Sequence, residues 1–146
     1  MKSYIVGLAM FFVLMFFITQ FVANEKSHYV RSVFSNTVYQ SAQQARQLGY
    51  FHPDIITALQ SNVAEKLNMN VGELDLVIDP STTTTTVKYR DVNFSESELI
   101  HYKIGIPITN IVPMAKYLGI SQDSNRYVFY VEGDVSSEKL NVAASP

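Results

Sequence analysis

Residues 4–22 of the chain, YIVGLAMFFVLMFFITQFV, decide its fold, because they are apolar apart from Thr19 and Gln20. No Asp, Glu, Lys or Arg occurs from residue 3 to residue 24. An α-helix rises about 1.5 Å per residue, so this run spans about 28 Å, which matches the hydrocarbon thickness of a bilayer. We therefore expect residues 1–23 to form a transmembrane anchor.

The anchor is expected to remain on the mature protein. A cleavable signal has a shorter apolar region, about 7–15 residues, followed by small residues three and one positions before the cut. Cleavage after Ala23 would place the bulky Phe21 at the first of these positions, and no other suitable pair of small residues lies nearby. These features favour an uncleaved anchor over a removed signal peptide.

The basic residues around the span bear on its orientation. Lys2 precedes the span and both Lys26 and Arg31 follow it, so a simple count slightly favours an outside N-terminus. We expect the reverse, because the lead is very short and long domains translocate largely regardless of charge. The prediction is a single-pass protein of the cell membrane whose C-terminal domain is extracytoplasmic.

The helix is predicted to continue beyond the membrane as an amphipathic stalk over residues 24–49. Residues 24–48 contain no Pro or Gly, and small or apolar residues recur there at three- and four-residue steps. This stripe comprises Val30, Phe34, Thr37, Val38, Ser41, Ala45 and Leu48. Gly49 then supplies a residue that tolerates the left-handed conformation of a helix end. Anchor and stalk together should form one helix of about 45 residues.

The remaining pattern predicts a small α+β domain over residues 50–131, with an antiparallel β-sheet packed on helices. A helix should begin at Pro53 and end between Asn68 and Gly72, with one apolar face made by Ile55, Ile56, Leu59, Val63 and Leu67. The period then changes to two, which predicts strands over residues 74–78, 81–90, 98–108 and 126–131. A short helix is expected over residues 109–118, and a disordered tail over residues 132–146.

Composition argues against several classes of function. Residues 24–146 contain ten basic and thirteen acidic residues with interspersed signs, so no basic surface for nucleic acid is expected. The chain has no cysteine, and His28, His52 and His101 lack any recognised metal-ligand spacing. No nucleotide-binding or nucleophile motif occurs. We predict that the protein is not an enzyme and that it uses no cofactor or metal.

Two residues of the anchor are candidates for contact with another helix in the membrane. Gln20 carries an amide that can hydrogen-bond between helices, although its place near the end of the run also lets it reach the headgroup layer. Gly7 follows Ser3 at the spacing that lets helix backbones approach closely. In the stalk, Val30, Phe34 and Val38 are candidates for the same interface, or for packing on the head domain of their own chain.

The layout of a span, an amphipathic helix and a small antiparallel sheet resembles that of pilins and pseudopilins, and is most similar to TadE/TadF-like pseudopilins of tight-adherence pilus and secretion machineries. Gly7 stands where a type IV prepilin has its cleavage-site glycine, whereas Phe12 occupies the position of its glutamate. The resemblance implies a minor or accessory structural component of a bacterial pilus, secretion or conjugation apparatus. Its partners would be the lipid bilayer and other pilin-like membrane proteins. The alternative is a membrane-tethered extracytoplasmic binding module.

Overall fold

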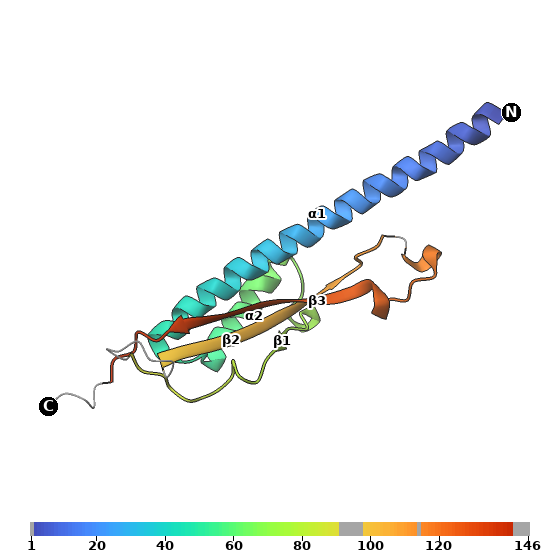
Figure 1. Cartoon of the computed structure of the whole chain (residues 1–146). Coiled ribbons are helices and arrows are strands. Elements are labelled where there is room, and N and C mark those ends of the chain that lie inside the picture. The colour runs from blue at the N-terminus through green and yellow to red at the C-terminus, as the bar shows by residue number, and fades with distance from the viewer. Residues whose placement is uncertain (1, 91–97, 114, 142–146) are drawn as a thin grey trace. The chain divides into compact units, whose positions relative to one another are not determined.

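The computed structural model describes residues 2–90, 98–113 and 115–141 of the protein. The described residues have the predicted α+β class, with two α-helices and a three-stranded antiparallel sheet in the order β1-β2-β3 (Figure 1). The helices are α1 (Lys2–Leu48) and α2 (Pro53–Leu67), and the strands are β1 (Val77–Ile78), β2 (Leu99–Thr109) and β3 (Arg126–Ser136).

The chain divides into two compact units, which are described separately. The N-terminal unit comprises Met1–Arg31 and Ile108–Tyr127, and the head unit comprises Ser32–Pro107 and Val128–Pro146. The sequence placed the start of the folded domain at residue 50, whereas the head unit already includes the last seventeen residues of α1. The predicted stalk is therefore not a separate element, because its second half belongs to the head.

Helix α1 is a single continuous helix of 47 residues, as the absence of Pro and Gly after Gly7 predicts. It is long enough, and over its first half apolar enough, to cross a membrane. The helix ends where predicted, because Gly49 adopts a φ of +82° and donates its N–H to the Ala45 carbonyl oxygen at 2.8 Å. A Cβ atom at Gly49 would also collide with the carbonyl oxygen of Lys88.

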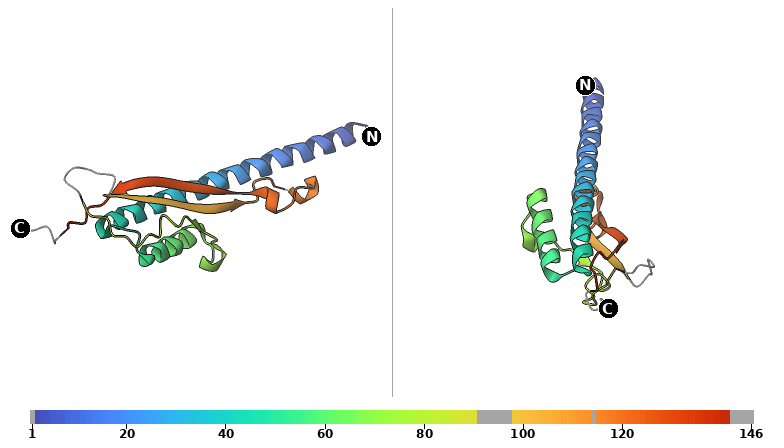
Figure 2. Two further views of the ribbon diagram at one scale, coloured as in Figure 1. Left: turned by 60° about the horizontal axis from the view of Figure 1, so that its bottom comes forward. Right: turned by 90° about the vertical axis from the view of Figure 1, so that its left-hand side faces the viewer.

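The core of the head unit is built on the second half of α1. Figure 2 shows α2 and the strands on either side of this half of the helix in its right-hand view. The α1 residues in the core, Phe34, Val38, Ala42 and Ala45, are at most 1% exposed, and so are the neighbouring Thr37 side chain and Leu59 of α2. Strand β2 contributes the predicted face of Ile100, Tyr102, Ile104 and Ile106. The predicted stripe ends early, however, since Leu48 is 42% exposed.

Helix α2 begins and ends where the sequence predicts. Pro53 occupies the first turn, and the chain leaves the helix through Asn68 in the left-handed conformation. The N-cap is His52, whose imidazole Nδ1 accepts the N–H of Asp54 at 3.2 Å. The His52 imidazole thus caps the N-terminus of α2.

The strand predicted over residues 81–90 is wrong. Residues 80–83 form a turn, and residues 84–90 have no regular secondary structure. Threonine hydroxyls compete here with a β ladder by bonding nearby backbone, as in the contacts of Thr83 with the Pro80 carbonyl and Thr84 with the Ser81 carbonyl. The strand predicted over residues 74–78 is also shorter, since β1 pairs only Val77 with Gly105 and Ile78 with Ile104.

The helix predicted over residues 109–118 is wrong as well. Asn110 has a φ of +58°, which breaks the helical backbone at its second residue. Among the described residues of the predicted helix, a short 3₁₀ turn, Ala115–Leu118, is the only helical element. Gly119 closes this turn with a φ of +72°, as predicted for the end of the element.

Strand β3 runs five residues past the predicted end, so residues 132–136 belong to the sheet and are not a disordered tail. The alternation of Glu132 and Asp134 with Val131, Gly133 and Val135 is the period-two pattern of a strand with one solvated face. Residues 137–141 continue to bond the head unit, for example through the Ser137 hydroxyl to the Lys88 carbonyl oxygen at 2.7 Å. The rest of the predicted tail, residues 142–146, lies outside the described residues.

Candidate functional site

The first half of α1 presents apolar side chains to its surroundings on every side. Phe12 and Phe17, at 65% and 66% exposed, are typical of them. A fully exposed Phe or Leu side chain forgoes about 1.5–3 kcal/mol of burial, so a surface of this size requires lipid or protein around it. This apolar surface is the first candidate functional site.

Gly7 and Gln20 lie at opposite ends of this apolar surface. Apart from its chain neighbours and its own helix backbone, no described residue lies within 4 Å of a Cβ atom built on Gly7, so its backbone is open to close approach. The Gln20 amide Nε2 donates to the carbonyl oxygen of Ile111 at 3.5 Å, a contact inside the N-terminal unit. The amide therefore already has a partner within its own chain, at the long limit of a hydrogen bond.

The three stalk candidates do not share one environment. Val30 is half-buried, whereas Phe34 and Val38 have no accessible surface. The Phe34 ring packs edge-on against Phe129 of β3, with ring centroids 6.4 Å apart. The structure therefore assigns Phe34 and Val38 to the core of their own head unit, because a fully covered side chain has no surface to offer a second subunit.

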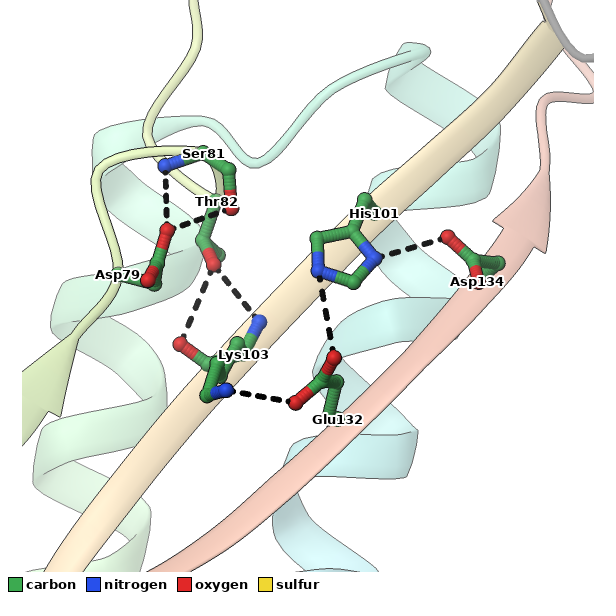
Figure 3. A network of polar contacts seen from close by, with 7 residues as sticks. All are labelled: Asp79, Ser81, Thr82, His101, Lys103, Glu132 and Asp134. Carbon is green, nitrogen blue, oxygen red and sulfur yellow. Dashed lines mark hydrogen bonds and ion pairs between the residues drawn. The ribbon is translucent and has the colours of Figure 1, made fainter.

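A network of charged side chains lies on the outward face of the sheet, across β2 and β3 (Figure 3). Lys103 Nζ lies 2.8 Å from a Glu132 carboxylate oxygen, and His101 Nδ1 lies 2.9 Å from an Asp134 carboxylate oxygen. The second imidazole nitrogen of His101 is 3.8 Å from Glu132. The network confirms that His101 and Lys103 occupy the polar face of their strand.

Threonine and serine hydroxyls extend this network to the other edge of β2. The Thr82 hydroxyl accepts the Lys103 N–H at 2.8 Å and lies 3.3 Å from the Lys103 carbonyl oxygen (Figure 3). Asp79 accepts both the hydroxyl of Ser81 at 2.7 Å and its N–H at 2.9 Å, and these bonds lower the pKa of the Asp79 carboxyl below its ordinary 3.8. Thr82 thus supplies the hydrogen bonds that a longer β1 would have made.

The chemistry of this network is that of a structural contact. Both ring nitrogens of His101 face carboxylates, and the nearby Ser81 hydroxyl donates to Asp79 and not to His101. In the described part of the chain, no three His, Asp or Glu side chains are grouped so that they could hold a metal ion.

A cleft of about 280 Å³ lies beside the network in the head unit. Its lining is rich in hydroxyl groups, from Ser81, Thr82, Thr84 and Thr86, and it also includes Lys88 and His101. A cleft of this size lies at the lower limit for small-molecule sites, and hydroxyl groups would bind a polar ligand through hydrogen bonds.

Comparisons with protein-family models, curated proteins and solved structures found no match. Two features of the described residues bear on function, namely the apolar surface of α1 and the polar face of the head unit.

The sequence alone did not predict the acidic residues of β3 or the structure of the segment between β2 and β3. Glu132 and Asp134 were assigned to a tail, although the alternating pattern around them was readable in the sequence. The sequence also predicts a helix between β2 and β3, whereas Ile111 of that segment contacts Gln20 of α1, 91 positions away in the chain. Local pattern contains no signal for contacts at such separations.

Two groups of β2, Lys103 on its polar face and Tyr102 on its buried face, give the head unit a predicted alkaline limit of stability. The hydrogen bond from Lys103 to Glu132 raises the pKa of Lys103 above its ordinary 10.5, and burial raises the pKa of the Tyr102 phenol above its ordinary 10.0. Both groups keep their proton to higher pH when folded than when unfolded. Their contribution is therefore complete below these ordinary values and is lost as the pH rises through the folded pKa.

We expect the melting temperature of the full chain in detergent to fall as the pH rises above 10.0, the ordinary pKa of tyrosine. The variant Tyr102→Phe should show a shallower fall, because it has no phenol to ionise. Thermal unfolding followed by circular dichroism measures both profiles. Parallel profiles for the two proteins would show that the Tyr102 phenol does not contribute.

Proposed function

We propose that the protein is a pilin-like structural or assembly component of a bacterial pilus or secretion apparatus, anchored in the cell membrane by α1 with its head unit outside. One observation carries the proposal. A single helix of 47 residues has an uncovered apolar first half, while the core of the head unit forms on its second half. The same helix thus forms the membrane-spanning segment and part of the head core.

The continuity of the helix favours an assembly subunit over a simple tether. A protein that only needs to be held near a membrane can use a flexible linker between anchor and domain. Here no Pro or Gly interrupts α1 between Gly7 and Gly49, so one helix contributes to both the membrane-spanning segment and the head unit. Such a shared helix is useful where subunits pack side by side.

The first half of α1 supplies surface for such packing. In a bilayer, helices associate through close van der Waals contact and polar bonds, since lipid removes the hydrophobic driving force between them. Gly7 offers an open backbone, and the phenylalanines around it offer area for van der Waals contact. A minor or accessory subunit is the form of the proposal that agrees with Phe12 in place of a glutamate.

Cysteine crosslinking in native membranes tests the proposal, because the chain contains no cysteine of its own. Single cysteines are placed in turn at residues 5–18, and oxidation is followed by gel electrophoresis. We expect crosslinks, to a second copy or to another membrane protein, at positions three and four residues apart on one face of α1.

Replacing Gln20 with Leu should weaken the association by about 0.5–2 kcal/mol if the amide bridges helices.

The same scan contains the result that would refute assembly. Crosslinks that are absent at every position, or equally weak around the whole helix, would mean that α1 meets only lipid. The Ala58→Cys variant, at an exposed position of α2, reports random collision between heads and sets the background.

A second candidate, a membrane-tethered binding module, is favoured by the hydroxyl-lined cleft beside His101. It would account for a polar head surface without requiring contacts between membrane helices. A crosslinking scan without helical periodicity, together with saturable binding of a polar ligand that Thr84→Val abolishes, would favour this reading.

A further inference from the structure

The segment between β2 and β3 approaches the membrane half of α1. The described residues 111–113 and 115–120, which we term the tip segment, belong to the same unit as Met1–Arg31. The Ile111 carbonyl oxygen lies 3.5 Å from Gln20 Nε2, whereas Tyr127, beyond the segment, contacts α1 further along. The Tyr127 hydroxyl is 3.4 Å from the Ser27 hydroxyl, and the Arg31 guanidinium lies 5.2 Å from the Tyr127 ring centre. The chain between β2 and β3 therefore follows α1 toward its N-terminus as far as Gln20.

This position fixes the depth of the tip segment relative to the apolar run. Gln20 lies inside that run, which ends at Val22, and the first charged residue after it is Glu25. A segment that contacts Gln20 is therefore at the end of the membrane-spanning part of α1. The bilayer surface is the environment expected at this point of the helix.

The tip segment exposes apolar side chains. Tyr117 is 84% exposed and Leu118 is 57% exposed, and Ile111, Val112 and Ile120 are half-buried. Lys116 is the only charged residue between Thr109 and Gln122. Tyrosine favours the membrane–water interface, and a lysine beside it can place its stem along apolar surface while its ammonium reaches water.

A buried asparagine holds the base of the segment in place. Asn125 is 6% exposed, and its side chain accepts the N–H of Val112 at 2.7 Å and donates to the Val112 carbonyl oxygen at 3.0 Å. This pair of bonds closes the base of the loop, so the loop that carries Tyr117 and Leu118 is anchored by its own chain.

We propose that the tip segment inserts into the interfacial layer of the same bilayer that α1 spans, and so forms a second membrane contact of the protein. The proposal rests on the membrane anchoring in the proposed function. Lipid is favoured over a protein partner because the segment lies beside the end of the apolar run and carries a single charge. At this depth its backbone polar groups remain within reach of headgroups and water.

Depth-dependent quenching in vesicles of phosphatidylcholine tests the proposal with the full chain. Single cysteines at Leu118, Leu14 and Ala58 carry an environment-sensitive fluorophore, and the quenchers are nitroxide-labelled lipids or aqueous iodide. We expect the probe at residue 118 to shift its emission to the blue, to lose intensity to a nitroxide near the headgroups, and to resist iodide. The probe at residue 58, on an exposed face of α2, should show the reverse. A probe at residue 117 should repeat the result for residue 118.

The three positions separate the failure of this inference from failure of the anchor. Iodide quenching at residue 118 with lipid quenching at residue 14 would overturn the tip contact alone. An absence of lipid quenching at residue 14 would overturn both the anchor and the tip contact. Because the vesicles contain no other protein, protection at residue 118 can come only from lipid or a second copy, and dilution to one chain per vesicle must leave it unchanged.

Discussion

Replacing Phe34 with alanine should lower the free energy of unfolding of the head unit by about 3–5 kcal/mol, the usual cost of removing a buried phenylalanine. The ring has no accessible surface and packs against Phe129 of β3, so its loss leaves a cavity between helix and sheet. Urea unfolding of the full chain in detergent, followed by the tyrosine signal of the head, measures the change.

Tyr39 provides the matched control, because it is an aromatic residue on the same helix that is 53% exposed. Tyr39→Ala should cost clearly less, since half of its side chain is already in water. Equal losses in the two variants would contradict the assignment of Phe34 to the core. Intact Phe34→Ala stability with altered crosslinking in membranes would instead support its role in an interface between subunits.

Removing the second half of α1 should unfold the head unit altogether. A fragment that begins at His52 lacks Phe34, Val38, Ala42 and Ala45, which are at most 1% exposed. The loss of Phe34 alone costs about 3–5 kcal/mol, and burial of a valine contributes about 1.5–3 kcal/mol more. Domains are stable by only about 5–15 kcal/mol in total, so the shortened fragment should not fold.

A fragment that begins at Ser32 is the comparison, because it retains every α1 residue of the head unit. We expect cooperative unfolding and dispersed amide signals in NMR spectra from this fragment, and neither from the one that begins at His52. If both fragments fold equally well, the head unit does not need α1 to fold. The shared helix would then no longer favour an assembly subunit over a simple tether.

The sequence predicts the helical half of this structure well. The boundaries of α1 and α2 follow from composition and from residues such as Pro53 and Gly49, whose effects on the backbone are local. Strand β2 follows in the same way, because large buried residues stand at alternate positions from Ile100 to Ile108. The bounds of these elements can be predicted without knowledge of distant contacts.

The errors occur where tertiary contacts or side-chain hydrogen bonds overrule propensity. The threonine run after Pro80 has high strand propensity, but its hydroxyls bond the backbone of its own turn. The stripe through Phe34 and Val38 favours packing on the chain's own head over a partner interface but leaves both open, because periodicity shows that a face is covered and not what covers it. Only the fold identifies the covering element as the chain's own sheet.

The candidate site was predictable in part. Gln20 was identified as the polar residue of the span, but its contact with Ile111 crosses 91 positions of sequence. The acidic partners of His101 and Lys103 lie on β3, beyond the point where the strand was predicted to end. Neither set of contacts can be predicted from local sequence, because both form only after folding brings distant segments together.

Chemical accessibility along α1 tests the central claim most directly, because that claim assigns one helix to both the membrane and the head core. Single cysteines from residue 4 to residue 48 are treated in intact cells with a membrane-impermeant maleimide, and a permeant maleimide serves as control. We predict an unbroken block of protection over residues 4–22, reaction at Asn24 and Glu25, and renewed protection at Phe34, Val38 and Ala45. Reaction within residues 10–16, or a mature chain that begins at Asn24, would contradict the account.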